Sequence, residues 1–178
     1  MISLLQEPRF DYVSPSDKAF IEAFDGEMTR LGYNFGNNIG DGFCWGKHML
    51  IYRKTGVKSK KVYARIYLRD EDIVLRLFFS GIDKHRAYIE QSPAHIKEAF
   101  TSDFSQCNHC HNEREDGTCK FRKSYTLDGM FYERCNGHTF WFFQPKIEKL
   151  PDYVGLFTEF YKPRKHNYGD CHARYARK

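Results

Sequence analysis

The sequence predicts an α+β fold, with a mainly antiparallel sheet of five to seven strands packed against helices. Residues 14–32 repeat apolar side chains at helical spacing, whereas segments such as "VYARIYLR" and "DIVLRLFF" alternate with period two. Asp128-Gly129 and Asn136-Gly137 add the turn dipeptides of antiparallel strands. Helical and strand-like segments are grouped rather than strictly alternating, as in α+β architectures.

The first clear element is a helix in "SPSDKAFIEAFDGEMTRLGY". Ser14 suits the N-cap, Pro15 the first helical position, and Gly32 the C-terminal stop. Before this helix, we expect residues 2–13 to form a short edge strand. One face of the predicted helix is apolar and would pack on the core; it consists of Phe20, Ile21, Phe24, Met28 and Leu31.

Three strands are predicted next, over about 43–53, 60–69 and 72–80, because these segments alternate between apolar and polar residues. Two short helical segments should then lie between Asp83 and Phe100, the second of them starting at a Ser-Pro pair.

The last third of the chain predicts a further three strands and a helix. "KFRKSYTL" and "MFYERC" flank Asp128-Gly129 and should form a hairpin, and "HTFWFF" follows Asn136-Gly137. "LPDYVGLFTEFY" has the apolar spacing of a helix that covers a core.

The positive charge is concentrated at the C-terminal end. The chain carries 28 Lys/Arg and 23 Asp/Glu, a formal net charge of +5. Residues 162–178 hold six Lys/Arg and one Asp, which leaves 22 basic and 22 acidic residues for positions 1–161. We therefore expect one α+β domain over 1–161 and a basic, flexible tail over 162–178. The tail is either a solvated end without a partner or a nucleic-acid-binding arm.

Four cysteines form the most specific motif, and we call them the cysteine cluster: Cys107, Cys110, Cys119 and Cys135. Cys107 and Cys110 form a C-x-x-C pair, which can bind one metal ion through two thiolates. Cys119 precedes one strand of the predicted hairpin and Cys135 ends the other, so both should lie at its open end. The sequence therefore predicts a structural zinc site that ties the loop to the hairpin within residues 107–135.

Other chemistries remain open at these thiols. An iron–sulfur cluster also uses four cysteine ligands and is the main alternative cofactor. Residues 107–111 match a haem attachment pattern, but that chemistry, like a disulfide knot, requires an exported protein. His109, His111 and His138 are reserve metal ligands.

A second candidate site lies on the strands over 60–69 and 72–80. With Asp70-Glu71 as a two-residue turn, Arg65 faces Arg76 on the same side of the sheet. Two opposed arginines repel each other, so an acidic side chain or a bound anion should compensate them. The functional hypothesis is a pocket for an anionic or aromatic ligand, and the alternative is a solvated face with carboxylate partners. The candidate ligand-binding residues are Tyr63, Arg65, Tyr67, Arg76 and Phe78.

The segment "WGKHMLIYRKTGVKSKKVYARIYLRDEDIVLRLFF" resembles small uncharacterised bacterial α+β domains, in which a Trp-containing strand and a "YRK" end lead into a meander. Over about residues 14–100, the order of elements is also similar to that of gyrase-inhibitor-like small-molecule-binding domains. This resemblance implies a ligand-binding groove on the sheet and a role as an effector sensor. It assigns no role to any single residue, and the cysteine segment departs from both patterns.

These observations predict a zinc-stabilised, non-catalytic domain that binds or senses a small molecule. The start of the chain has no export signal and no segment is long and apolar enough for a membrane helix, so we expect a cytoplasmic protein without a membrane partner. The alternatives are a zinc protein that binds nucleic acid through its basic tail, and an enzyme of unassigned chemistry, for which the sequence provides no catalytic motif.

Overall fold

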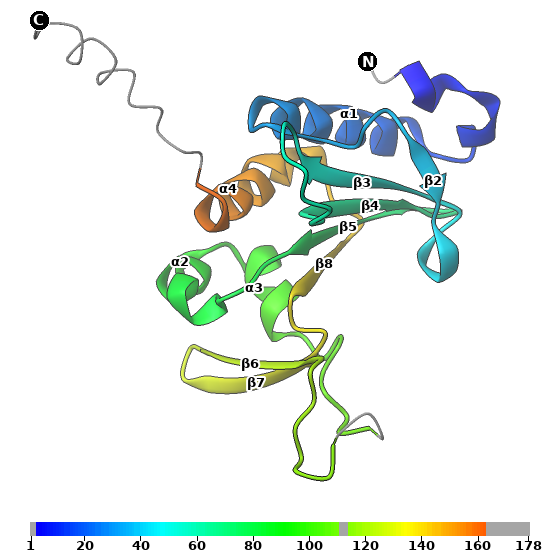
Figure 1. Ribbon diagram of the computed structural model, residues 1–178. Coiled ribbons are helices and arrows are strands. Elements are labelled where there is room, and N and C mark those ends of the chain that lie inside the picture. Colours follow the sequence, from blue (N-terminus) through cyan, green and yellow to red (C-terminus); the bar gives the residue numbers. More distant parts are fainter. Residues whose placement is uncertain (1–2, 111–113, 163–178) are drawn as a thin grey trace, which may run out of the picture.

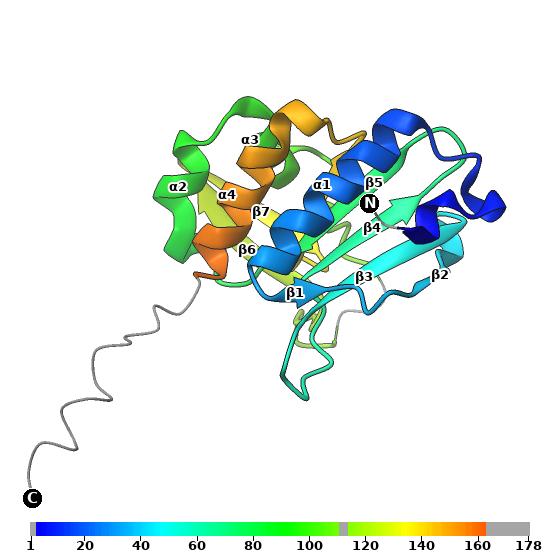
Figure 2. The ribbon, with the colours of Figure 1, turned by 90° about the horizontal axis from the view of Figure 1, so that it is seen from above.

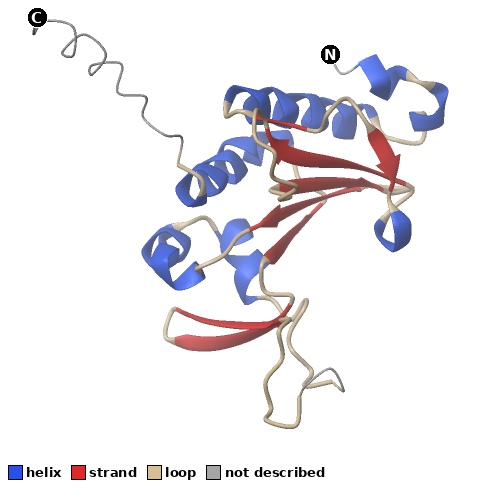
Figure 3. Ribbon diagram, viewed as in Figure 1, coloured by secondary structure: helices blue, strands red, loops and turns tan. Residues whose placement is uncertain are grey.

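The protein combines one antiparallel sheet with helices and a separate two-stranded hairpin, as a computed structural model of residues 3–110 and 114–162 shows (Figures 1 and 3). The predicted α+β class and antiparallel sheet are confirmed. No helix in these described ranges is long and apolar enough to cross a membrane.

The main sheet has six strands in the order β1-β3-β4-β5-β8, and β2 also pairs with β3. All of the pairings are antiparallel. The strands with alternating sequences therefore form the centre of the sheet, and the strand predicted after Asn136-Gly137 forms one edge. The bounds are Tyr33–Asn34 (β1), Ile39–Asp41 (β2), His48–Lys54 (β3), Ala64–Leu68 (β4), Ile73–Phe78 (β5) and Thr139–Phe143 (β8).

Helices α1 and α4 lie over one face of this sheet (Figure 2). The main hydrophobic core fills the space beneath them and continues under α3, where Ile96 and Phe100 are buried. We call the opposite side of the sheet the outer face. The helix bounds are Pro15–Arg30 (α1), Arg86–Gln91 (α2), Ala94–Thr101 (α3) and Leu150–Phe160 (α4), with shorter 3-10 turns at Ser3–Gln6, Pro8–Phe10, Phe43–Trp45, Ile82–His85 and Ile147–Lys149.

The start of α1 follows the predicted capping pattern. The Ser14 side chain accepts a hydrogen bond from the Asp17 backbone N–H at 3.1 Å, and Pro15 occupies the first turn. Phe20, Ile21, Phe24 and Met28 are all buried on the predicted face of the helix. This apolar face anchors α1 on the sheet, since tertiary burial stabilises a helix more than its intrinsic propensity does.

Residues 2–13 do not form the expected edge strand. From Ser3 to Phe10, they form two 3-10 turns, which bury Leu5 and Phe10 in the core. Pro8 starts the second turn and lacks the N–H that a strand ladder needs. The short strands β1 and β2 occupy this edge instead, and both pair with β3.

The hairpin predicted around Asp128-Gly129 is confirmed as β6 (Arg122–Leu127) and β7 (Met130–Cys135). Asp128 and Gly129 have φ angles of 48° and 76°, as a tight hairpin turn with two left-handed residues requires. This hairpin is not part of the main sheet. Backbone hydrogen bonds to residues 105–107 and side-chain contacts hold it in place.

Arg134 of β7 makes these contacts. The residue is only 2% exposed, and its guanidinium donates hydrogen bonds to the carbonyl oxygens of Phe100 (2.7 Å), Phe104 (3.0 Å) and Ser102. Its Nε also donates to the Tyr125 hydroxyl at 3.2 Å. The three carbonyls lie at and after the C-terminal end of α3, so one cation satisfies backbone acceptors that the helix leaves unpaired.

Replacing Arg134 with Met should lower the free energy of unfolding by about 3 kcal/mol or more, since several buried acceptors would lose their donor. Urea unfolding measures this change. Arg30→Met is the matched control, because Arg30 pairs with Glu27 on the surface and should contribute less than about 1 kcal/mol. Equal effects of the two substitutions would contradict the role given to Arg134.

Candidate functional site: an arginine pair and a cysteine cluster

The predicted register of β4 and β5 is observed. Arg65 lies opposite Arg76, and Tyr67 lies opposite Val74. The turn between the strands closes through a hydrogen bond from the Arg69 N–H to the Asp72 carbonyl at 2.9 Å, which leaves Asp70 and Glu71 as the two turn residues. We call Arg65 and Arg76 the arginine pair.

Aromatic side chains hold both guanidinium groups on the outer face. The Tyr67 hydroxyl accepts a hydrogen bond from Nη1 of Arg65 at 3.1 Å and another from Nη1 of Arg76 at 3.3 Å. The Phe78 ring centroid is 5.5 Å from Cζ of Arg65 and 5.0 Å from Cζ of Arg76. Arg76 also stacks over Trp141 of β8 at 4.0 Å. Cation–π contacts and a shared acceptor thus fix the orientation of the two cations.

No carboxylate compensates the arginine pair in the part of the chain that the structure describes. Neither arginine forms an ion pair there, and the Nε atoms of both are buried without a hydrogen-bond partner. Burial lowers the pKa of the Arg76 guanidinium, and the nearby charge of Arg65 lowers it further, against the opposing effect of Tyr67. Arg76 is 7% exposed, while Arg65 is half-buried and accessible to solvent. The site is therefore a positive, partly dehydrated surface without a carboxylate partner among the described residues.

Four of the five predicted ligand-binding residues come together: Arg65, Tyr67, Arg76 and Phe78. Tyr63 does not join them. It precedes the first ladder residue of β4, and its ring lies 4.8 Å from the rings of both Tyr33 and Tyr161. Because Tyr63 lies before the start of β4, strand alternation does not determine the direction of its side chain. Tyr63 packs with aromatic rings next to the main core.

Sequence reasoning did not identify Trp141, although it contacts Arg76. It belongs to β8, which is far along the chain and pairs with β5 so that Arg76 and Trp141 are opposite each other. The Asn136-Gly137 turn signal predicted a strand at "HTFWFF", but local patterns did not predict which strand would be its neighbour. A buried cluster on the outer face consists of Met49, Tyr67, Val74 and Trp141.

Partly exposed aromatic rings surround Trp141. Trp45 contacts it with a centroid distance of 4.4 Å, and Phe104 contacts it edge-on at 5.6 Å. Phe104 also meets Phe143 at 5.1 Å. Trp45, Phe104 and Phe143 are 43%, 40% and 46% exposed, so they form an accessible aromatic rim beside the arginine pair.

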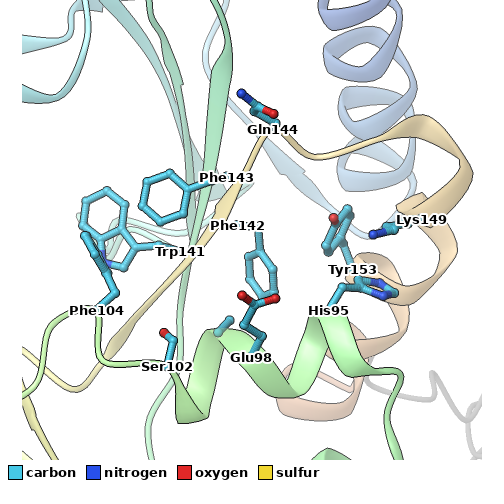
Figure 4. Close-up of a pocket in the computed structure, with 11 residues that line it drawn as sticks. His95, Glu98, Ser102, Phe104, Trp141, Phe142, Phe143, Gln144, Lys149 and Tyr153 are labelled. Atoms are coloured by element: carbon cyan, nitrogen blue, oxygen red, sulfur yellow. The ribbon is translucent and has the colours of Figure 1, made fainter.

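The aromatic rim continues into a cavity of about 310 Å³ (Figure 4). Figure 4 shows Trp141, Phe104 and Phe143 on one side, with Glu98 and His95 of α3 on the other. His95 lies 3.1 Å from the Asp152 carboxylate and therefore connects α3 to α4. The volume is at the lower end of the range for small-molecule sites, and the lining combines aromatic rings with a few polar groups.

The cysteine cluster lies at the open end of the hairpin, as predicted. Cys135 ends β7, and its N–H donates to the Ser105 carbonyl at 2.9 Å, while the Cys107 N–H donates to the Glu133 carbonyl at 3.0 Å. The segment that carries Cys107 therefore runs beside β7. All four cysteines line one cavity of about 120 Å³.

The four cysteines share this cavity, but the described residues do not form a metal-coordination site. Among the described residues, no three Cys, His, Asp or Glu side chains are arranged to hold a metal ion. Burial raises the pKa of the Cys135 thiol, and the charges of Cys107, Cys110 and Cys119 raise it further.

The reserve histidines do not all lie near the cluster in the described residues. His109 contacts the Glu133 carboxylate at 3.0 Å and Nη1 of Arg122 at 2.8 Å. The His138 ring lies 3.2 Å from the Phe79 carbonyl oxygen, in the main body of the protein. His111 and residues 163–178, which include most of the predicted basic tail, lie outside the described residues.

No protein-family model, curated protein or solved structure matches this chain. The two candidate sites are therefore defined by the residues of this chain alone.

Replacing Tyr67 with Phe should lower the free energy of unfolding by about 2 kcal/mol, since hydrogen bonds from charged donors contribute about 1.5–3 kcal/mol. The substitution leaves both guanidinium groups without their shared acceptor. Chemical denaturation measures the change, and Tyr88→Phe at a 36% exposed position is the control, with an expected change within about 0.5 kcal/mol. An unchanged stability of Tyr67→Phe would show that the hydroxyl does not hold the arginine pair.

Proposed function

We propose that this protein is a zinc-stabilised, non-catalytic domain that binds or senses a small anionic aromatic molecule on its outer face. The observation that carries the proposal is the arginine pair, in which two opposed and partly dehydrated cations have no carboxylate partner in the described residues. The ligand's anionic group would contact Arg65, and Arg76 would add positive charge behind it.

Electrostatics favours a bound anion over a purely structural role for the pair. Removing charges from water is costly, and an opposite charge close by offsets part of this cost. Here, the two cations have like charge, and within the described ranges they contact a shared hydroxyl and ring faces rather than a carboxylate. Carboxylate and phosphate groups fit the planar donors of a guanidinium, so an anion would supply the missing partner.

The aromatic rim favours a ligand that also has a ring. Trp45, Phe104 and Phe143 remain partly exposed beside the pair, and Phe104 and Phe143 line the cavity of about 310 Å³. A ligand with an anionic group at Arg65 could place a flat apolar part against these rings, where edge-to-face and stacked contacts are favourable.

Zinc would stabilise the loop that carries the cysteine cluster. None of the described residues between 101 and 121 is buried, so the loop gains little free energy from apolar burial. Ordering such a segment costs roughly 1–2 kcal/mol per residue in backbone entropy. A metal ion bound by four thiolates would offset this cost, and the cavity shared by the four cysteines supports that arrangement. Reduced thiols of this kind fit the proposed cytoplasmic location.

Thermal-shift measurements with a panel of aromatic carboxylates and aromatic phosphates test the ligand proposal. At a concentration about 100 times its Kd, a ligand should stabilise the wild-type protein by about 2.7 kcal/mol. Arg65→Gln should remove most of this shift. Arg30→Gln, on the exposed surface of α1, is the charge-matched control and should retain it. The same ligand response in all three proteins would refute the assignment of the site.

Elemental analysis of the purified protein tests the zinc proposal. We expect about one zinc per chain, as one four-thiolate site would bind. Cys135→Ser should lose it, while Cys44→Ser should retain it, because Cys44 is exposed and outside the cluster. If the protein instead contains iron and has a visible absorption band, the iron–sulfur alternative is correct and the zinc proposal is wrong. Equal zinc contents in the two variants would exclude the cluster as the metal site.

A further inference from the structure

The outer face adjoins a basic segment that the net charge of the chain does not reveal. Between Asp41 and Asp70, there are eight Lys/Arg and no acidic residue, although positions 1–161 as a whole are neutral. Every residue from 53 to 61 is exposed, and the lysines and arginine of this range form no ion pair with a carboxylate of the described chain. We call residues 53–61 the basic loop.

The basic loop and the aromatic rim lie at opposite ends of the same strands. The loop connects the end of β3 to the start of β4, where Arg65 is the second residue. Phe143 pairs with Val74, four residues along β5 from Phe78, which is roughly 13 Å at about 3.3 Å per residue. The arginine pair lies between them. Exposed cations, a dehydrated arginine pair and exposed rings therefore follow one another along the sheet.

Two of the acidic residues near the aromatic end are already paired. Asp70 forms an ion pair with Lys47, and the Asp72 carboxylate lies 2.8 Å from Nε of Arg69. These contacts reduce the repulsion that an anion would meet near Trp45, while the basic loop retains its positive charge.

We propose that the outer face binds single-stranded nucleic acid, with bases against the aromatic rim and phosphates at Arg65 and the basic loop. This inference rests on the proposed function, since it assigns the anionic aromatic ligand as the nucleotide unit of a strand. Trp45, Phe104 and Phe143 provide ring faces or edges for bases, and Lys58, Lys60 and Lys61 provide cations for the phosphates.

The arrangement fits a single strand better than a duplex. Base stacking on protein side chains needs unpaired bases whose faces are free, and a duplex hides these faces. Proteins that bind single strands combine positive charge along the nucleic-acid backbone with aromatic platforms. Here, the basic loop and Arg65 supply the positive charge, and the aromatic rim supplies the platform. The surface from the basic loop through the arginine pair to the aromatic rim is longer than one nucleotide, so several phosphates can be bound at once.

Fluorescence anisotropy with a labelled oligothymidylate of about 15 nucleotides, a length that spans one such site, tests the proposal on the full chain. Lys58→Ala/Lys60→Ala/Lys61→Ala should weaken binding at least about tenfold at low salt and reduce the salt dependence, by about 0.7 in log–log slope per lost phosphate contact. Trp45→Ala should weaken binding about fivefold or more through lost stacking. The matched duplex should bind more weakly than the single strand.

Two control variants locate the contact. Lys18→Ala/Lys84→Ala/Lys97→Ala removes the same charge from α1, the turn at Ile82–His85 and α3, and it should change the affinity less than about twofold. Arg174→Ser/Arg177→Ser/Lys178→Ser removes charge from the C-terminal end, and it should cost less affinity than the basic-loop variant. The proposal is overturned if either control weakens binding as much as the basic-loop variant does.

Thymidine monophosphate separates this inference from the proposed function. If the mononucleotide stabilises the protein through Arg65 but the oligonucleotide binds no more tightly, the site takes a small molecule and the strand proposal fails. If Arg65→Gln changes neither response, both proposals fail. Tighter binding of the oligonucleotide that depends on both Arg65 and the basic loop supports the inference.

Discussion

The register between β4 and β5 is the constraint on which the outer face depends. Because side chains alternate along a strand, a shift of one residue would send Arg65 or Arg76 to the helix-covered core and break the pair. The two-residue turn at Asp70-Glu71 fixes this register, and the apolar residues of the inner face enforce it. A fold that buries its core correctly therefore also holds two cations together on the opposite face.

Two buried arginines show how differently the same side chain is used. Arg134 is fully enclosed and donates to three backbone carbonyls and a hydroxyl, so its contacts explain its presence through stability alone. Arg76 is nearly as buried, yet its hydrogen bond goes to a hydroxyl shared with another cation, and its Nε has no hydrogen-bond partner among the described residues. The first arrangement positions the hairpin and, through it, the cysteine cluster. The second has no carboxylate partner among the described residues and is the basis of the proposed ligand site.

Local patterns were sufficient for much of the fold. The Ser14-Pro15 start of α1, the alternation of β4 and β5 and the Asp128-Gly129 turn each act over a few residues, and the structure contains all three. Contacts between residues that are distant in the sequence were not predictable. The contacts of Trp141 and Tyr63 depend on which distant strand or helix becomes their neighbour. The hydrogen bonds that Arg134 donates depend on the path of the chain after α3. The strand expected before residue 14 does not form, because Pro8 and the burial of Leu5 and Phe10 favour tight turns.

The central claim is that the arginine pair takes its counter-charge from a bound anion. NMR of the arginine side chains, with inorganic phosphate added at constant ionic strength, observes this directly. Nε of Arg65 and Arg76 should shift and saturate together, while Nε of Arg134, which already donates to the Tyr125 hydroxyl, should stay fixed. Unchanged Arg65 and Arg76 resonances across the titration, or shifts of the same size at Arg134, would contradict the account.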